Sequence, residues 1–196
     1  MGQNATDRVK ASLAAANDAL AQFLSDQRAV DRIALVGAKI AAAMRSGGKV
    51  LACGNGGSCC DAMHFCEELT GRFRQDRRAL PAIACSDPSH LTCVANDFGF
   101  EFVFSRWVEA LGRPGDVLIA LSTSGNSRNI VRAVESAGTI GMHRVALLGQ
   151  GGGVLSGLCE HQWIVPARTS DRIQEIHMLI LHCIVEAVEI ELGVGS

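Results

Sequence analysis

The chain has 196 residues, close to the size of one domain, and hydrophobic residues make up 48% of it. That share is enough to fill a core and too high for a disordered tail. The 18 Lys and Arg residues against 20 Asp and Glu residues give a formal charge of −2, and there is no Tyr. A weak net charge and few aromatic side chains argue against nucleic-acid binding.

The N-terminal residues and the cysteines indicate in which cellular compartment the protein is expected. Residues 1–7 lack a basic segment followed by an apolar one, and no apolar run reaches about 18 residues. We therefore expect neither secretion nor a membrane span. No cysteine pair has the CxxC spacing of zinc or redox motifs. We interpret the cysteines as small buried side chains in a reducing, cytoplasmic compartment. They are Cys53, Cys59, Cys60, Cys66, Cys85, Cys93, Cys159 and Cys183.

The chain begins with two predicted helices. Apolar residues recur every three to four positions over 7–25 and again over 26–45, and Gly47 and Gly48 end the second helix. Both helices are rich in Ala, which allows close packing. We expect these two helices to pack on helices of a partner subunit as well as on their own core, and we expect the long C-terminal helix to take part in the same subunit contacts.

From Lys49 onward, short apolar runs alternate with helical patterns. Such runs, without polar alternation, are typical of strands buried on both faces of a parallel sheet. The predicted strands are 49–53, 82–85, 116–121, 144–148 and 162–165, and the predicted helices are 59–73, 90–96, 101–111, 129–137 and 171–192. This order predicts an α/β fold with a doubly wound, five-stranded parallel sheet. We expect one domain over 1–196, with a helical extension at 1–47 and an α/β core at 48–196.

Two similar turns follow predicted strands and precede predicted helices. They are Gly54–Ser58 and Ser122–Ser127, at the positions where open parallel sheets bind ligands. The second turn combines hydroxyls with free backbone N–H groups at a helix N-terminus, which suits a phosphate group. The alternative is that these polar residues only cap helices and fill turns.

Two helices carry candidate catalytic or metal-binding side chains. His64 and Glu68 are four residues apart and share one helix face, so they could bind a metal or divide acid–base work. The last helix is apolar nearly all round, yet it contains Gln174, His177 and His182. A buried helix must find partners for such residues. The alternative is that each His is a satisfied core or interface group.

Six segments resemble the phosphoheptose isomerase (sedoheptulose 7-phosphate isomerase) family of sugar-isomerase (SIS) domains. The resemblance covers nearly the whole chain, including the two leading helices. The segments are Cys53–Ser58, Asp61–Phe65, Glu67–Arg72, Asn96–Gly99, Ser122–Ser127 and Arg172–His177.

The resemblance implies an isomerase that converts D-sedoheptulose 7-phosphate to D-glycero-D-manno-heptose 7-phosphate, the step that begins ADP-heptose synthesis for lipopolysaccharide. It implies a cytoplasmic homotetramer with sites at subunit contacts. Glu68 is the implied base and His182 the implied acid, and His64, Glu68, Gln174 and His182 the implied zinc ligands. The implied substrate-binding residues are Asn55, Gly56, Gly57, Ser58, Glu68, Asn96, Asp97, Ser122, Thr123, Ser124, Ser127 and Gln174.

The proposed residues suit aldose–ketose exchange, in which a proton moves between neighbouring carbons through an enediol. The spacing of Gln174 and His182 limits how both could bind the same zinc ion, because they lie eight residues apart, about 12 Å along a helix. They can share one ion only by leaning together, or if two subunits supply the ligands. The segment 167–170, before the last helix, has no assigned role.

Two alternatives stay open. A non-catalytic tetrameric relative binds the bacterial replication initiator but lacks residues equivalent to the acid and base. The presence of Glu68 and His182 favours the enzyme. An isomerase of another phosphosugar is the second alternative, because the residues point to the phosphate more firmly than to the carbon chain.

Overall fold

The computed structural model describes residues 4–195 and contains a five-stranded parallel sheet. The strands follow the spatial order β2-β1-β3-β4-β5. Their bounds are β1 (Val50–Gly54), β2 (Ala82–Ala84), β3 (Val117–Ser122), β4 (His143–Leu148) and β5 (His161–Ile164). This sheet confirms the predicted doubly wound α/β fold.

The centre of the sheet is the place where the chain changes its direction of winding. From β1 the chain goes outward to β2, then returns to the other side of β1 to form β3, β4 and β5. Gly54 at the end of β1 pairs with Leu121 near the end of β3. The loops that follow these two strands therefore lie side by side at a topological switch point, where doubly wound sheets bind ligands.

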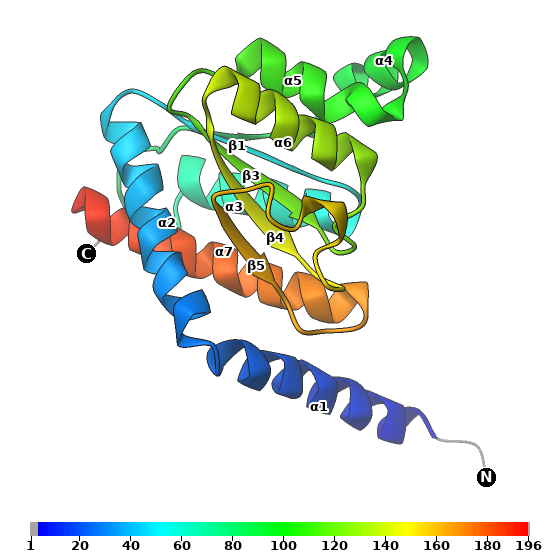
Figure 1. Cartoon of the computed structure of the whole chain (residues 1–196). Coiled ribbons are helices and arrows are strands. Elements are labelled where there is room, and N and C mark those ends of the chain that lie inside the picture. Colours follow the sequence, from blue (N-terminus) through cyan, green and yellow to red (C-terminus); the bar gives the residue numbers. More distant parts are fainter. Residues whose placement is uncertain (1–3, 196) are drawn as a thin grey trace.

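Helices cover both faces of the sheet (Figure 1). One face packs against α2 (Gln27–Arg45), α3 (Gly57–Thr70) and α7 (Ser170–Leu192). The other packs against α4 (Pro88–Phe98), α5 (Val103–Leu111) and α6 (Arg128–Ile140). Alternate residues of each strand enter opposite cores, as in β1, where Val50 and Ala52 face one core and Leu51 and Cys53 the other. Short 3₁₀ turns lie at Phe100–Phe102 and Gly153–Leu155.

Helix α1 (Ala5–Leu24) reaches out from the body of the molecule (Figure 1). The Asn4 side chain caps its start by accepting a hydrogen bond from the Asp7 N–H. Only Ala19 and Phe23 of this helix are buried, whereas Val9 and Leu13 are 58% and 66% exposed. The first half of α1 thus presents an apolar face that its own chain does not cover.

The apolar surface of helix α7 finds partners within its own chain, and the prediction that this helix also forms subunit contacts stays a prediction. Most of that surface is buried within its own chain, where α7 packs against α2 and α3. The approach to α2 is close, because a Cβ added at Gly37 would lie 2.4 Å from the Ala187 Cβ. The apolar run of α7 is explained by this central position in the fold.

The cysteines are all free thiols, but the prediction that they are buried is only partly right. Cys53, Cys66 and Cys85 are buried, whereas Cys60 and Cys93 are exposed and the other three are intermediate. The exposed two lie on helices α3 and α4, which have a solvent face as well as a core face.

Among residues 4–195, no helix combines the length and the apolar character that a membrane crossing requires. Residues 1–3 and 196 lie outside the described part of the chain. The predicted domain bounds and the prediction of no secretion signal both extend to residues in these two ends.

Candidate active site

The loop after β1 holds a tight turn that brings the backbone close to α3. A Cβ at Gly54 would lie 2.5 Å from the Ser58 carbonyl oxygen, so this position requires glycine. Gly56 has a φ of 55°, in the region that favours glycine. The Asn55 side chain exchanges two amide hydrogen bonds of 3.0 and 2.8 Å with the buried Asn129 at the start of α6. This pair ties the first loop to the second.

The loop after β3 concentrates hydroxyl groups. The Ser122 hydroxyl accepts a hydrogen bond of 3.1 Å from the Gly125 N–H and lies 3.3 Å from the Ser127 hydroxyl. The Ser124 hydroxyl accepts from the Asn126 N–H at 3.2 Å, and the Thr123 hydroxyl lies 3.3 Å from that of Ser170. Part of this polar set therefore stabilises the turn itself. Ser127 occupies the position before α6 without a side-chain capping bond in the described structure.

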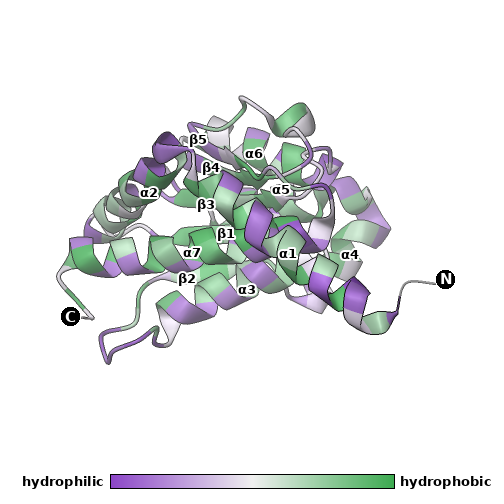
Figure 2. Cartoon of the chain, turned by 90° about the horizontal axis from the view of Figure 1, so that it is seen from below, coloured by the Kyte–Doolittle hydropathy of each residue, from purple (hydrophilic) through white to green (hydrophobic). Residues whose placement is uncertain are grey.

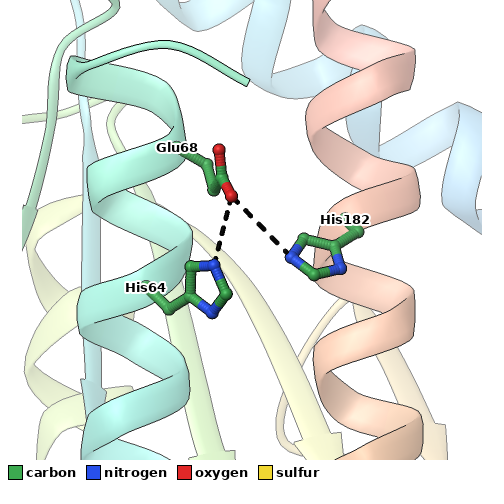
Figure 3. A group of neighbouring side chains, drawn as sticks. All are labelled: His64, Glu68 and His182. Atoms are coloured by element: carbon green, nitrogen blue, oxygen red, sulfur yellow. Dashed lines mark hydrogen bonds and ion pairs between the residues drawn. The ribbon is translucent and has the colours of Figure 1, made fainter. Parts of the chain in front are cut away.

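His64, Glu68 and His182 form one cluster, as Figure 3 shows. Helix α3 supplies the first two, and α7 supplies His182 from the neighbouring helix. The Glu68 Oε1 atom lies 3.1 Å from the His64 Nε2 atom and 4.0 Å from the His182 Nε2 atom. The two imidazole rings meet edge to face at a centroid distance of 5.1 Å. The fold thus brings together three predicted site residues that are up to 118 positions apart in the chain.

The surroundings of the cluster lower the pKa of His182. Burial is the largest cause, and the nearby His64 and Arg74 add to it, while Glu68 acts in the opposite direction. The Phe73 ring stacks on the His182 ring at a centroid distance of 5.7 Å. The lowered pKa favours the neutral imidazole, which can both donate and accept a proton.

Asp61 is a neighbour that the sequence analysis did not single out as a site residue. It lies three residues before His64 on α3, and burial raises its pKa from 3.8 to about 6. Its Oδ2 atom is buried and has no hydrogen-bond partner among the described residues. The i, i+3 spacing of Asp61 and His64 places both on one face of the helix, and this spacing is the sequence signal that could have identified Asp61.

Gln174 lies away from the cluster, against the first loop. Its amide donates a hydrogen bond of 3.3 Å to the Ser58 hydroxyl, and a Cβ at Gly57 would lie 2.6 Å from the same amide nitrogen. Gln174 therefore meets the first turn of α3, whereas His182 meets the second half of that helix. Its predicted role as a fourth zinc ligand stays a prediction.

Asn96 and Asp97 lie exposed near the end of α4, on the opposite face of the sheet from α7. The Asn96 amide donates to Asp97 Oδ1 at 2.7 Å, and the Cys93 thiol lies 3.6 Å from Asp97 Oδ2. No hydrogen bond joins them to the cluster within the described chain. Their role in substrate binding also stays a prediction.

His177 follows the alternative interpretation of a core histidine, although only one of its two ring nitrogens is satisfied: the buried Nδ1 atom has no hydrogen-bond partner among the described residues. It is fully buried, and its Nε2 atom forms a hydrogen bond of 3.0 Å with the carbonyl oxygen of Leu148 at the end of β4. Burial lowers its pKa from 6.5 to about 4. This histidine is therefore neutral and fastens α7 to the sheet.

The donor set of the cluster fits a zinc ion. One ligand atom from each of His64, Glu68 and His182 lies within 4.8 Å of the others. Two imidazoles and one carboxylate are ligands that catalytic zinc sites use, with a further position left for water or substrate. The same residues can also exchange protons with a bound molecule, because a carboxylate and a neutral imidazole differ in proton affinity.

Comparison with known proteins gives a consistent result. Residues 12–149 match the model of the SIS domain family. A phosphoheptose isomerase of Fusobacterium nucleatum is 57% identical over 170 residues, 87% of this chain and 88% of that protein. One from Vibrio cholerae is 52% identical over 188 residues, 95% of this chain and 98% of that protein.

Two solved structures share the architecture. The phosphoheptose isomerase of Neisseria gonorrhoeae superposes with a TM-score of 0.87 at 38% identity, covering 95% of this chain and all of that one. The Francisella tularensis structure of the same name gives a TM-score of 0.89 at 33% identity, covering 96% of this chain and all of that one. On fold, coverage and identity together, the chain belongs to the phosphoheptose isomerase family of SIS domain proteins.

Proposed function

We propose that the protein isomerises D-sedoheptulose 7-phosphate to D-glycero-D-manno-heptose 7-phosphate, the first step toward ADP-heptose for lipopolysaccharide. Membership of the phosphoheptose isomerase family supports this reaction. The single observation that carries it is the carboxylate of Glu68 beside the His182 imidazole, at 4.0 Å and across two helices. An aldose–ketose isomerase needs such a carboxylate and a second proton carrier.

Glu68 is the proposed base. It removes the proton from C1 of the ketose, and the C–H electron pair becomes the C1–C2 double bond of the enediol. His182 delivers a proton to the C2 oxygen as its carbonyl bond opens. In the second half, the deprotonated His182 takes the O1 proton and is thereby restored, the C1 carbonyl forms, and protonated Glu68 returns its proton to C2.

The two oxygens of Glu68 can divide two tasks. Oε1 faces both histidines, while the second oxygen points away from them in Figure 3. Zinc, held by His64, Glu68 and His182, would stabilise negative charge that develops on the sugar oxygens. Because Oε1 faces both histidines, it would hold that ion, and the other oxygen would remain for the carbon-bound proton. Gln174 could serve as a fourth ligand only if its side chain leans toward His182, or if the Gln174 of a second subunit supplies the ligand.

The loop of Ser122, Thr123, Ser124 and Ser127 is the proposed phosphate site. It contains hydroxyls and the start of helix α6, whose N-terminal N–H groups favour an anion. Asn55, Gly56, Gly57 and Ser58 come from the adjacent loop, so both sit at the switch point of the sheet. We assign the body of the sugar to this loop after β1, with Asn96 and Asp97 contributing from α4.

A cytoplasmic homotetramer is the proposed assembly. Val9 and Leu13 expose an apolar face on α1, and a second copy of the chain is the occupant that the family suggests for it. The presence of Glu68 and His182 favours catalysis over a replication-initiator-binding role for this chain.

The test is incubation with sedoheptulose 7-phosphate and, in parallel, with five- and six-carbon ketose phosphates, followed by NMR. We expect conversion of the seven-carbon substrate to heptose 7-phosphate at a kcat/KM at least tenfold above that for the shorter sugars. Faster turnover of a shorter sugar would favour an isomerase of another phosphosugar. No turnover of any of them would favour the non-catalytic alternative.

A further inference from the structure

Arg77 connects the two helices that carry the Glu68 and His182 side chains. It lies in the segment between α3 and β2, and its side chain is 1% exposed. Its Nε donates a hydrogen bond of 2.8 Å to Oε1 of Glu189 on α7, whose side chain is 7% exposed. A buried ion pair has a desolvation cost that other hydrogen bonds must offset.

Those other hydrogen bonds go to the end of helix α3. The Nη2 atom of Arg77 donates to the Glu68 carbonyl at 2.6 Å, and Nη1 donates to the carbonyls of Leu69 and Gly71 at 2.9 and 3.1 Å. The last carbonyls of a helix lack partners within it, and a cation there also complements the helix dipole. The last turn of α3 contains no basic residue of its own, so Arg77 supplies the cap from outside the helix.

Glu189 follows His182 by seven residues, which is about two helical turns. The two side chains therefore project from the same side of α7, toward α3. Figure 2, which views the molecule from below, shows α3 and α7 lying side by side in front of the sheet. At the other end of this contact, Gln174 of α7 packs on Gly57 and bonds to Ser58. The His64, Glu68 and His182 cluster lies between these two fixed points.

We propose that Arg77 is a positioning residue for Glu68. Through the Glu68 carbonyl it fixes the height of that residue in the last turn of α3, and through Glu189 it fixes the separation of α3 from the His182 face of α7. This inference rests on the proposed function for the role of Glu68, and it assigns to Arg77 no contact with substrate. A displacement of Glu68 by a fraction of the 4.0 Å gap would change both proton transfer and ligand geometry.

The test compares Arg77→Lys with Glu189→Gln, using Glu186→Gln as the matched control. Lysine keeps the charge opposite Glu189 but cannot donate to several carbonyls through a planar fork. The control also removes one carboxylate of α7 that pairs with an arginine of the same segment, Arg74, but that pair is 63% and 46% exposed. Exposed pairs contribute little.

We expect Arg77→Lys and Glu189→Gln to lower kcat at least tenfold while KM changes less than threefold. We also expect the Kd for zinc chloride, measured by calorimetry on metal-free protein, to rise at least tenfold. Glu186→Gln should stay within twofold of wild type in all three quantities. Measurements are made well below each variant's Tm, so that loss of folded protein does not contribute.

Wild-type kcat and zinc affinity in folded Arg77→Lys, with only a lower Tm, would overturn the inference. If Arg77→Lys does not fold, the same outcome in Glu189→Gln, which keeps the shape of the glutamate but removes the charge that pairs with the buried Arg77, would overturn it. The kinetic measurements and the zinc-binding measurements together also separate this inference from the proposed function. A wild type that is inactive on every sugar contradicts the proposed function. In that case the Kd for zinc still tests whether Arg77 positions Glu68.

Discussion

The buried His177 side chain predicts a specific loss of stability in acid. The folded chain holds this imidazole neutral with a pKa of about 4, because burial penalises the charged form, whereas the unfolded chain titrates near 6.5. Between these two values the unfolded chain binds a proton that the folded chain does not. The free energy of unfolding therefore falls as the pH falls from about 6.5 to about 4.

The size of the effect follows from the difference between the two pKa values. At about 1.36 kcal/mol for each pKa unit, a depression from 6.5 to about 4 corresponds to roughly 3 kcal/mol. This contribution to stability is fully present above pH 6.5 and fully lost below pH 4. His177→Gln removes the titration, while its amide can still donate to the Leu148 carbonyl that His177 contacts now.

Urea unfolding at pH 7, 6, 5 and 4.5, at one fixed protein concentration, measures this contribution. The wild type is expected to lose more stability over this range than His177→Gln, by roughly 2 to 3 kcal/mol. Other titrating groups affect both proteins and cancel in the difference. Parallel stability curves for the two proteins would refute the assignment of a neutral buried imidazole.

Three further changes test other parts of the molecule. Ser124→Ala should raise KM for the phosphosugar severalfold with kcat within twofold, since phosphate is held equally in the ground and transition states; steady-state kinetics showing a lower kcat at constant KM would instead assign Ser124 to the chemical step. Leu13→Asp, at a position 66% exposed in the single chain, should leave the fold intact and dissociate the proposed tetramer in light scattering, whereas an unchanged tetramer would show that this face is not part of the subunit contact. Gly37→Val should lower the free energy of unfolding by about 1–3 kcal/mol or more in urea titration, because even a Cβ there would lie 2.4 Å from Ala187; wild-type stability would contradict the close α2–α7 packing.

The fold could be predicted because its local signals agree. Apolar runs such as 116–121 appear as the buried strand β3, and the helical pattern of 171–192 appears as α7. Helix ends were less predictable. Helix α3 ends at Thr70 rather than at residue 73, since Gly71 leaves helical backbone geometry and Arg77 caps the end from a distant position.

The site could be predicted only where one helix carries the information. His64 and Glu68 are paired by their i, i+4 spacing, and the structure confirms that they are neighbours. The pairing of Asn55 with Asn129 and that of Arg77 with Glu189 depend on which elements the topology brings together. No spacing along the chain encodes such contacts, and so the sequence analysis missed both.

The central claim is that Glu68 transfers the carbon-bound proton. Its most direct test is NMR of sedoheptulose 7-phosphate in D₂O with wild type, Glu68→Gln and the control Glu67→Gln, whose exposed side chain is the next one along α3. Glu68→Gln should fold normally and reduce both isomerisation and deuterium incorporation at carbon by at least about 10²-fold, because an amide cannot accept the proton. Glu67→Gln should match the wild type. Glu68→Gln activity within tenfold of wild type would contradict the account.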